Sequence, residues 1–159
     1  MAEAYTYHEH NLENHKEKYG PSIRYRLEKG QFLPASAYIN AQRLRQKERQ
    51  IWADLYREID VFLSPTVIMP AFSIGEKTVA FGSDAVNPRV HPVLMYLTSL
   101  GNFNGYPVIS LPCGFTEDGL PIGFQIQGKP FAEMRVFLSA YAYEQAHPQI
   151  WERKCGLWK

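Results

Sequence analysis

The chain has few cysteines, no long apolar run and almost no net charge. Its two cysteines, Cys113 and Cys155, are far apart among 159 residues and lie in no metal-type spacing. A disulfide framework is therefore not expected, and a reducing cytoplasm is the simplest compartment. No apolar stretch approaches the ~20 residues that span a bilayer, and the first ten residues are too polar for a signal peptide. These absences predict a cytoplasmic, globular protein with no membrane partner.

The near-neutral charge also argues against nucleic acid as a partner. The chain has 17 Lys and Arg against 16 Asp and Glu, a formal net charge of +1. A basic run at 43–49 could suggest RNA contact, but Glu48 interrupts it and no aromatic residues are interleaved. A solvated helix face explains the run better than a nucleic-acid site does.

Motifs for nucleophilic, nucleotide or metal chemistry are missing. The sequence holds no nucleophile elbow, phosphate-binding loop, dinucleotide fingerprint or zinc-protease motif. At His8-Glu9-His10, Leu12 occupies the position where a second zinc-binding histidine would stand, so no metal and no cofactor are expected. Cys113 lies inside an apolar strand pattern and is expected to be a small buried core residue rather than a nucleophile.

Hydrophobic spacing predicts helices alternating with short buried strands, hence an α/β class and a single domain over 1–159. The helices are expected at 5–19, 21–29, 36–58, 92–100 and 132–146. In the last helix one face carries Met134, Phe137, Leu138, Tyr141 and Gln145. Strands are expected at 61–64, 108–115 and 121–127, the last two as an antiparallel hairpin through Asp118-Gly119. Pro112 should lie at an edge or a bulge, and 65–92 should form a long irregular loop.

Three blocks in the second half resemble a known family. They are DVFLSPT at 60–66, NFNGYPVISLPCGF at 102–115 and DGLPIGFQI at 118–126. Segments 19–21, 26–30, 37–41 and 143–146 fit the same series. Together they resemble the closing part of amidase-signature proteins, which include amidases and the amidase subunit of tRNA-dependent amidotransferases. The resemblance implies the C-terminal part of an α/β/α sandwich, a mixed sheet with flanking helices.

The family's catalytic residues cannot be carried over to this chain. Those enzymes hydrolyse amides with a serine nucleophile, a second serine on a cis peptide bond and a lysine, all upstream of the matched blocks. This sequence has no adjacent serine pair and no glycine-rich serine stretch. An unassisted serine hydroxyl is a weak nucleophile, so the chain alone is expected to hydrolyse no amide.

The resemblance implies that this part of the fold supplies sheet strands and walls of the acyl-side pocket. The candidates for pocket lining are Thr66, Met95, Asn102, Asn104 and Tyr106. The alternative is that these residues only pack a turn against the sheet. The ligand of the complete enzyme would be a small amide.

Met95 narrows the choice between substrate classes. In the amidotransferase subunits an aspartate stands shortly before the Asn-x-x-Gly-x-Pro block and helps to hold glutamine. Counting back from Gly105, Met95 occupies that place. A thioether cannot pair with an ammonium group as a carboxylate does. A general amidase with a more apolar substrate is therefore favoured over glutamine-dependent amidation of tRNA.

Three interpretations stay open. The chain is part of an amidase whose N-terminal catalytic portion is absent, a split-gene product that works with a separate partner, or a non-catalytic interaction module. The helical pattern is already running at Tyr5, which favours truncation. The expected partners are the missing catalytic portion or a second copy of the chain.

Overall fold

The structure, a computed structural model, describes residues 1–76, 78–81, 83–86 and 92–152. Contacts divide the chain into two compact units, residues 1–48 and 49–159. The helix α3, Ala35–Leu55, begins in the first unit and ends in the second. The assignment of 1–159 to one domain stays a prediction, and Cys155 lies outside the described residues.

The first unit is helical. It contains α1 (Ala2–Asn14), α2 (Pro21–Glu28), the start of α3, and 3-10 turns at Lys16–Lys18 and Lys29–Phe32. The first helix, predicted to reach Tyr19, ends earlier because His15 leaves helical angles at φ −143° and ψ 32°. Nδ1 of His8 then lies 3.0 Å from the Tyr19 hydroxyl across the turn. His8 is therefore a helix-packing residue in this unit.

Close packing holds these helices together. Leu12 of α1 and Leu27 of α2 are the buried apolar side chains. Gly30 passes so near the start of the chain that a Cβ added there would lie 2.4 Å from the Met1 carbonyl oxygen. Only glycine allows that approach without a backbone shift.

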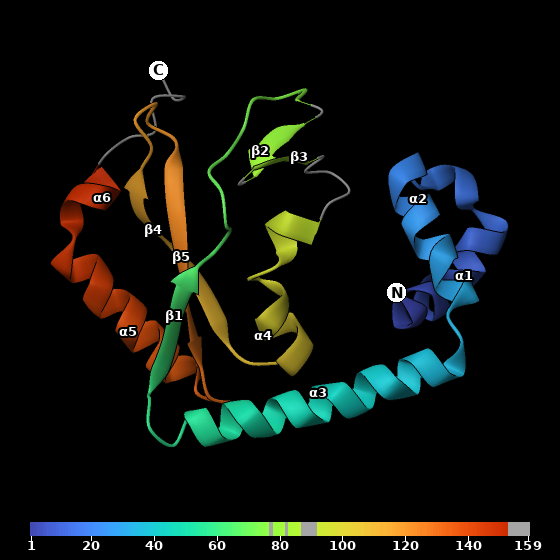
Figure 1. Cartoon of the computed structure of the whole chain (residues 1–159), viewed down its shortest axis with the longest axis horizontal. Helices are drawn as coiled ribbons and strands as arrows, with labels where there is room; N and C mark the ends of the chain where they lie inside the picture. The colour runs from blue at the N-terminus through green and yellow to red at the C-terminus, as the bar shows by residue number, and fades with distance from the viewer. Residues whose placement is uncertain (77, 82, 87–91, 153–159) are drawn as a thin grey trace. The chain divides into compact units, whose positions relative to one another are not determined.

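The second unit contains a three-stranded sheet in the order β1-β5-β4 (Figure 1). Its strands are β1 (Val61–Pro65), β4 (Val108–Phe115) and β5 (Pro121–Gly128). Ser64 and Ser110 both lie opposite Gln125 in the register. The hairpin predicted through Asp118-Gly119 is confirmed, with φ 83° at Gly119. All described strand pairs are antiparallel, so the expected mixture of parallel and antiparallel pairing is not found among them.

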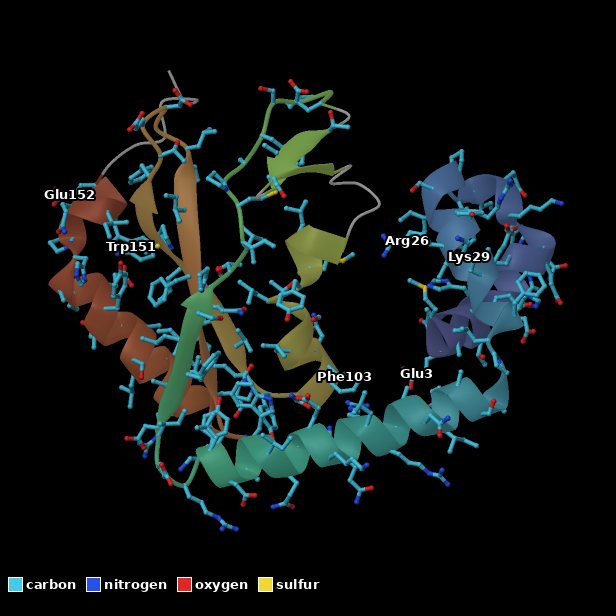
Figure 2. The ribbon with its side chains drawn as sticks, in the orientation of Figure 1. Glu3, Arg26, Lys29, Phe103, Trp151 and Glu152 are labelled. Atoms are coloured by element: carbon cyan, nitrogen blue, oxygen red, sulfur yellow. The ribbon has the colours of Figure 1, made fainter. Side chains whose placement is uncertain are left out.

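Helices lie on both sides of this sheet, which confirms the α/β class. On one face α5 (Glu133–Ala146) packs its Ala140 against Leu111 and Ile126, which form the buried core. On the other side lies α4 (Ser99–Asn104) (Figure 1). After α5 comes the short α6 (Pro148–Glu152), which carries Trp151 and Glu152 (Figure 2). Helix, sheet and helix thus form three layers within this unit.

The apolar stripe expected on the last helix is exposed. Met134 is 70% exposed, Phe137 60%, Leu138 61% and Tyr141 61%. The helix turns a narrower face, with Val136 and Ala140, towards the sheet. The second unit therefore presents an apolar helix face to solvent. No helix within the described residues is both long enough and apolar enough to traverse a membrane.

The bounds predicted for the helix over 92–100 are wrong. A 3-10 turn occupies Pro92–Met95, and the α-helix begins at Ser99 and continues to Asn104. The Asn-Gly pair that favours a turn instead ends this helix. Gly105 takes the left-handed conformation, with φ 72° and ψ 36°, and donates its N–H to the Gly101 carbonyl at 2.8 Å. Left-handed glycine is a common end of a helix.

Two further expectations need correction. The loop over 65–92 is not wholly irregular, since β2 (Val79–Phe81) and β3 (Asp84–Val86) pair as a small antiparallel hairpin. Cys113 is exposed rather than buried. It lies at the bulge between Pro112 and Gly114 of the edge strand, where its thiol is 3.5 Å from the Ile122 carbonyl oxygen. The placement of Pro112 at an edge and a bulge is confirmed.

Candidate functional site

The sheet face opposite α5 carries a row of polar side chains. Ser64 of β1, Gln125 of β5 and Ser110 of β4 are direct cross-strand neighbours. Because side chains alternate between the faces of a sheet, all three point away from the α5 core. Neighbours of this kind have Cβ atoms about 5 Å apart, close enough for their polar groups to act on one ligand.

Two hydroxyl groups meet at the end of this row. Oγ1 of Thr66, just beyond β1, lies 2.5 Å from Oγ of Ser110 on β4. They reach one another across β5 because Gly123 has no side chain there. A Cβ at Gly123 would lie 3.1 Å from Oγ1 of Thr66 and 3.5 Å from Oγ of Ser110. The glycine thus makes the hydroxyl pair possible.

Gln125 is the central and most buried polar residue of the row, with only 6% of its surface exposed. Its Nε2 donates to Oγ of Ser64 at 2.9 Å and to the Leu97 carbonyl oxygen at 3.1 Å. The carbonyl partner requires an N–H donor, so it fixes the orientation of the amide. Both amide hydrogens are then used, and Oε1 keeps its capacity to accept.

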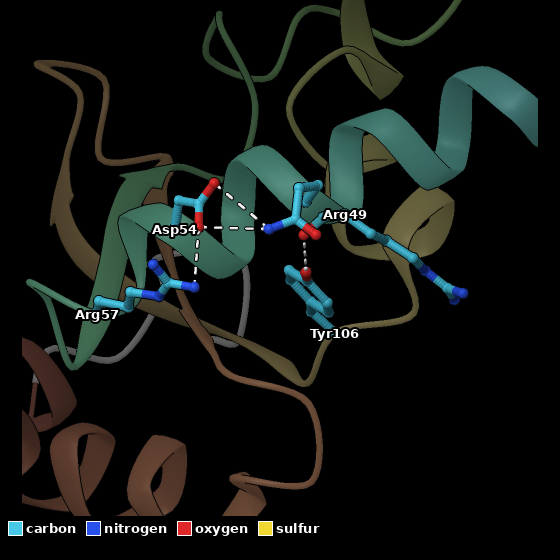
Figure 3. A network of polar contacts seen from close by, with 5 residues as sticks. Arg49, Asp54, Arg57 and Tyr106 are labelled. Atoms are coloured by element: carbon cyan, nitrogen blue, oxygen red, sulfur yellow. Dashed lines mark hydrogen bonds and ion pairs between the residues drawn. The ribbon is translucent and has the colours of Figure 1, made fainter.

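The C-terminal end of α4 is held by α3. Nε of Arg49 donates to the Asn104 carbonyl oxygen at 3.0 Å. Figure 3 shows the second contact, in which the Tyr106 hydroxyl donates to the Arg49 carbonyl oxygen at 3.3 Å. A guanidinium at the carbonyl end of a helix satisfies groups that have no partner within the helix. These contacts fix the turn that follows Gly105.

Two tyrosine side chains, those of Tyr56 and Tyr106, pack against each other next to this turn. Tyr56 is 3% exposed, and its hydroxyl donates to the Gln127 carbonyl oxygen at 3.1 Å. Its ring meets that of Tyr106 edge to face, with centroids 5.8 Å apart. Burial raises the pKa of Tyr56 above its ordinary value, and the side-chain amide of Gln127 lowers it by less. Burial likewise raises the pKa of Tyr106.

These elements surround a depression with a volume of about 460 Å³. Its polar lining residues are Thr66, Thr98, Asn102, Tyr106, Ser110 and Gln125. The remaining lining residues are glycines and a valine, so no charged side chain among the described residues lines the depression. A second depression of about 380 Å³ follows segment 67–72 and is mainly apolar.

The structure brings together three of the five predicted pocket residues. Thr66, Asn102 and Tyr106 line the depression. Asn104 is 1% exposed and lies in the protein interior, and its side-chain amide has no hydrogen-bond partner among the described residues. Met95 is 52% exposed and is not among the residues lining this depression. A substrate-binding role for any of the five stays a prediction.

Sequence reasoning missed Ser110 and Gln125 as lining residues. Their signal was present, because both are polar residues at alternating positions of otherwise apolar strands. The bulge between Pro112 and Gly114 shifts the register by one residue and so brings Ser110 opposite Gln125. A register counted from the Asp118-Gly119 turn alone would have placed Leu111 there instead.

The lining can bind a ligand but offers little for acyl transfer. As far as the structure describes the chain, it contains hydroxyls, amides and a phenol, and no histidine, lysine or carboxylate. Activation of a hydroxyl needs a nearby base. Within the described part of the chain, no group of His, Cys, Asp and Glu could hold a metal ion either.

Comparison with known proteins decides the family. The family model described as Amidase matches residues 2–137. The chain belongs to the amidase family. It is 34% identical over 156 residues to an amidase from Pseudomonas putida, covering 94% of this chain and 33% of that protein. It is 39% identical over 135 residues to a glutamyl-tRNA(Gln) amidotransferase subunit from Oceanobacillus iheyensis, covering 82% of this chain and 26% of that one.

Solved structures agree with this family fold. A crystal structure described as an amidase superposes with a TM-score of 0.77 at 28% identity, over 88% of this chain and 33% of that chain. The likeness confirms the expected amidase-signature fold. The chain spans about a third or less of the length of the curated relatives it matches.

Proposed function

We propose that this amidase-family chain supplies sheet strands and one wall of the substrate pocket to an amide (C–N) hydrolase, and that it hydrolyses no amide by itself. One observation carries the proposal: the described residues that line the depression between β1, β4, β5 and α4 are hydrogen-bonding groups without a base. That lining suits recognition rather than bond cleavage. We also propose that the chain forms the C-terminal part of this enzyme and that the enzyme is cytoplasmic.

The sequence explains why this chain is not expected to activate a nucleophile. The chain contains no adjacent serines, and the Thr66–Ser110 pair has only uncharged neighbours in the depression. A hydroxyl next to neutral amides has no base to accept its proton and stays a poor nucleophile. A catalytic portion on another polypeptide segment would have to provide nucleophile, base and oxyanion-binding groups.

The partner that best fits is such a catalytic portion, with self-association of the chain as the alternative. The relatives are about three times as long as this chain. The strands β1 and β4 both lie at edges of the described sheet, and α5 exposes large apolar side chains. Open edges and apolar faces are typical of surfaces that meet another chain.

A second candidate function is the amidase subunit of a glutamine-dependent tRNA amidotransferase. The 39% identity to the Oceanobacillus iheyensis protein favours it. Met95 in the place of the glutamine-holding aspartate disfavours it, and so does the uncharged depression. A split-gene subunit would show turnover together with its separate catalytic partner, whereas a non-catalytic interaction module would share the fold and lack turnover in every assembly.

A chimera tests the proposal. This chain would replace the matching third of the Pseudomonas putida relative, and ammonia release from aliphatic and aromatic amides would be measured. We expect turnover, with a KM that rises severalfold in Thr66→Val and Ser110→Ala and stays unchanged in Glu117→Gln, at the exposed β4–β5 turn. A folded chimera without turnover would contradict the proposal and support the interaction module.

A further inference from the structure

The outer face of α5 carries a strip of large apolar side chains that remain open to solvent. Met134, Leu138 and Tyr141 follow one another at steps of four and three residues, so they lie on one side of the helix. Each is more than half exposed. The main contacts of α5 run to β4, β5 and α6, and Val136 and Ala140 are its buried residues. The strip therefore points away from the sheet.

A fourth large apolar residue, Phe131, lies three residues before Met134. Its side chain is 95% exposed, and its backbone takes a φ of 62°. The Ala132 N–H donates to the Lys129 carbonyl oxygen at 3.1 Å, so Phe131 occupies the third position of a four-residue turn, directly after Pro130. Glycine or asparagine is the usual residue at a positive φ in that position. Backbone strain of this kind is found mainly at functional sites.

The exposed area of these four residues matches the lower end of what a specific dimer buries. An aromatic side chain offers about 150–250 Å² and Met or Leu somewhat less, so the exposed fractions leave roughly 500 Å² open on each copy. Two copies would cover on the order of 1,000 Å² in total, the size at which specific interfaces begin. Such an area favours a reversible dimer with a Kd on the order of 10 µM.

The charge of the chain permits two copies to meet at this strip. None of the four residues is charged, so their burial leaves no unpaired charge. The whole chain carries a formal net charge of +1, so two copies do not repel each other strongly at a distance. Two-fold pairing brings the same surface of both chains together, and an uncharged apolar strip is complementary to itself.

The catalytic portion of the proposed enzyme is not expected to cover this strip. In that enzyme the catalytic portion continues the sheet, whose described edges are β1 and β4. Strands added at these edges bring helices beside α5, in the same layer, because helices and sheets stack as layers around one core. The strip lies on the outer side of that layer, since α5 covers one face of the sheet with its opposite side (Figure 1).

We infer that the strip formed by Phe131, Met134, Leu138 and Tyr141 is a two-fold interface at which a second copy of this chain docks through its own α5. The pairing buries the same four residues on both copies. Only the exclusion of the catalytic portion as the occupant rests on the proposed function. Leu138 lies at the middle of the helical part of the strip, so it meets its own counterpart in either direction of a two-fold helix pair.

Disulfide trapping in the intact chain tests the pairing. Cys113→Ser and Cys155→Ser remove the native thiols, and a single cysteine is then introduced by Leu138→Cys or, as the control at the exposed β4–β5 turn, by Glu117→Cys. We expect Leu138→Cys to form a disulfide-linked dimer about tenfold faster than the control or more, because docking holds the two thiols at a high effective concentration. Equal rates for the two variants would overturn the inference.

A second pair of variants separates contact from folding. Phe131→Asn suits the left-handed backbone and removes the ring. We expect its urea midpoint to be unchanged or higher, while the Kd of association measured by sedimentation rises about tenfold or more. Ile74→Asn removes a fully exposed apolar side chain outside the strip and should leave the Kd unchanged. The inference also fails if Phe131→Asn leaves the Kd unchanged or if both substitutions raise it equally.

Adding the part of the Pseudomonas putida relative that this chain does not match distinguishes the interface from the proposed function. We expect the trapping rate of Leu138→Cys to stay the same in this mixture, because the strip remains on the outside. Trapping that persists without amide turnover would contradict the proposed function and support the interface. Trapping abolished by the added portion would overturn the interface, whether or not turnover appears.

Discussion

At the scale of single residues, Gly123 leaves room for the Thr66–Ser110 hydroxyl pair. A Cβ there would lie 3.1 Å from Oγ1 of Thr66, whereas a Cβ at Gly114 would meet nothing within 4 Å. Replacing glycine by alanine restricts the unfolded chain by a similar amount at both positions. We therefore expect Gly123→Ala to be about 1 kcal/mol less stable than the matched Gly114→Ala, which corresponds to one lost hydrogen bond.

Urea unfolding of both variants measures this difference in the free energy of unfolding. In a Ser110→Ala background the pair is already absent, so the difference should shrink. Equal stabilities of Gly123→Ala and Gly114→Ala in the unaltered background would show that the pair contributes nothing.

Tyr56 links burial to pH dependence. Burial raises the pKa of its hydroxyl above 10.0, so the folded state favours the protonated form. This contribution to stability is complete below about pH 10 and is lost as the pH rises further. At neutral pH, Tyr56→Phe should cost about 1 kcal/mol, because the Gln127 carbonyl oxygen loses its donor.

The pH dependence of stability distinguishes the loss of the Tyr56 hydroxyl from a loss of packing. Between pH 9 and pH 11 the stability of Tyr56→Phe should fall less steeply than that of the unaltered chain. Tyr96→Phe is the matched control, since Tyr96 is 68% exposed. Parallel curves for the two variants in urea unfolding would contradict the argument.

At the scale of elements, the end of α4 depends on the left-handed Gly105. Its φ of 72° is strained for any residue with a Cβ. We expect Gly105→Ala to lower the free energy of unfolding by about 1 kcal/mol and Gly105→Asn by less, since asparagine tolerates this conformation better. Urea unfolding midpoints check the order, and an alanine variant as stable as the asparagine variant would contradict it.

Elements with a strong local pattern could be predicted from the sequence. The apolar runs before Pro65 and around the Asp118-Gly119 turn predicted three strands of one sheet, and the structure confirms them. The turn fixes the hairpin register only as far as the bulge between Pro112 and Gly114, beyond which the pairing is shifted by one residue. The long helix and the last helix were predicted within a few residues of their observed bounds.

Features set by tertiary contacts could not be predicted. The exposure of Cys113 depends on a bulge and an edge position that an apolar run does not reveal. The sequence of α5 did not show which of its apolar residues face the sheet. Val136 and Ala140 face it, but Phe137, which is exposed, is apolar as well. Predicting the depression would have required both the strand register and the hydrogen bonds of Gln125.

At the scale of the whole molecule, the exposed face of α5 predicts association. Phe137 and Tyr141 are one helical turn apart and both are more than half exposed. At roughly 25 cal/mol per Å² of apolar surface, a patch of a few hundred Å² supplies several kcal/mol of driving force for association. We expect the isolated chain to self-associate with rising concentration.

Sedimentation over a range of concentrations measures this association. A Phe137→Glu/Tyr141→Glu double variant should sediment closer to the monomer with an unchanged unfolding midpoint, because these side chains do not contribute to the core. Glu117→Gln should behave as the unaltered chain. A monodisperse monomer at every concentration would show that the fold needs no covering partner.

The central claim is that the chain provides a pocket wall and no catalytic machinery of its own. Ammonia release from a panel of amides tests it most directly, with three samples: this chain, the complementary two-thirds of the Pseudomonas putida relative, and both together. The account predicts background release from each alone and amide-dependent release from the mixture. Turnover by the chain alone, abolished by a single substitution within its 159 residues, would contradict it.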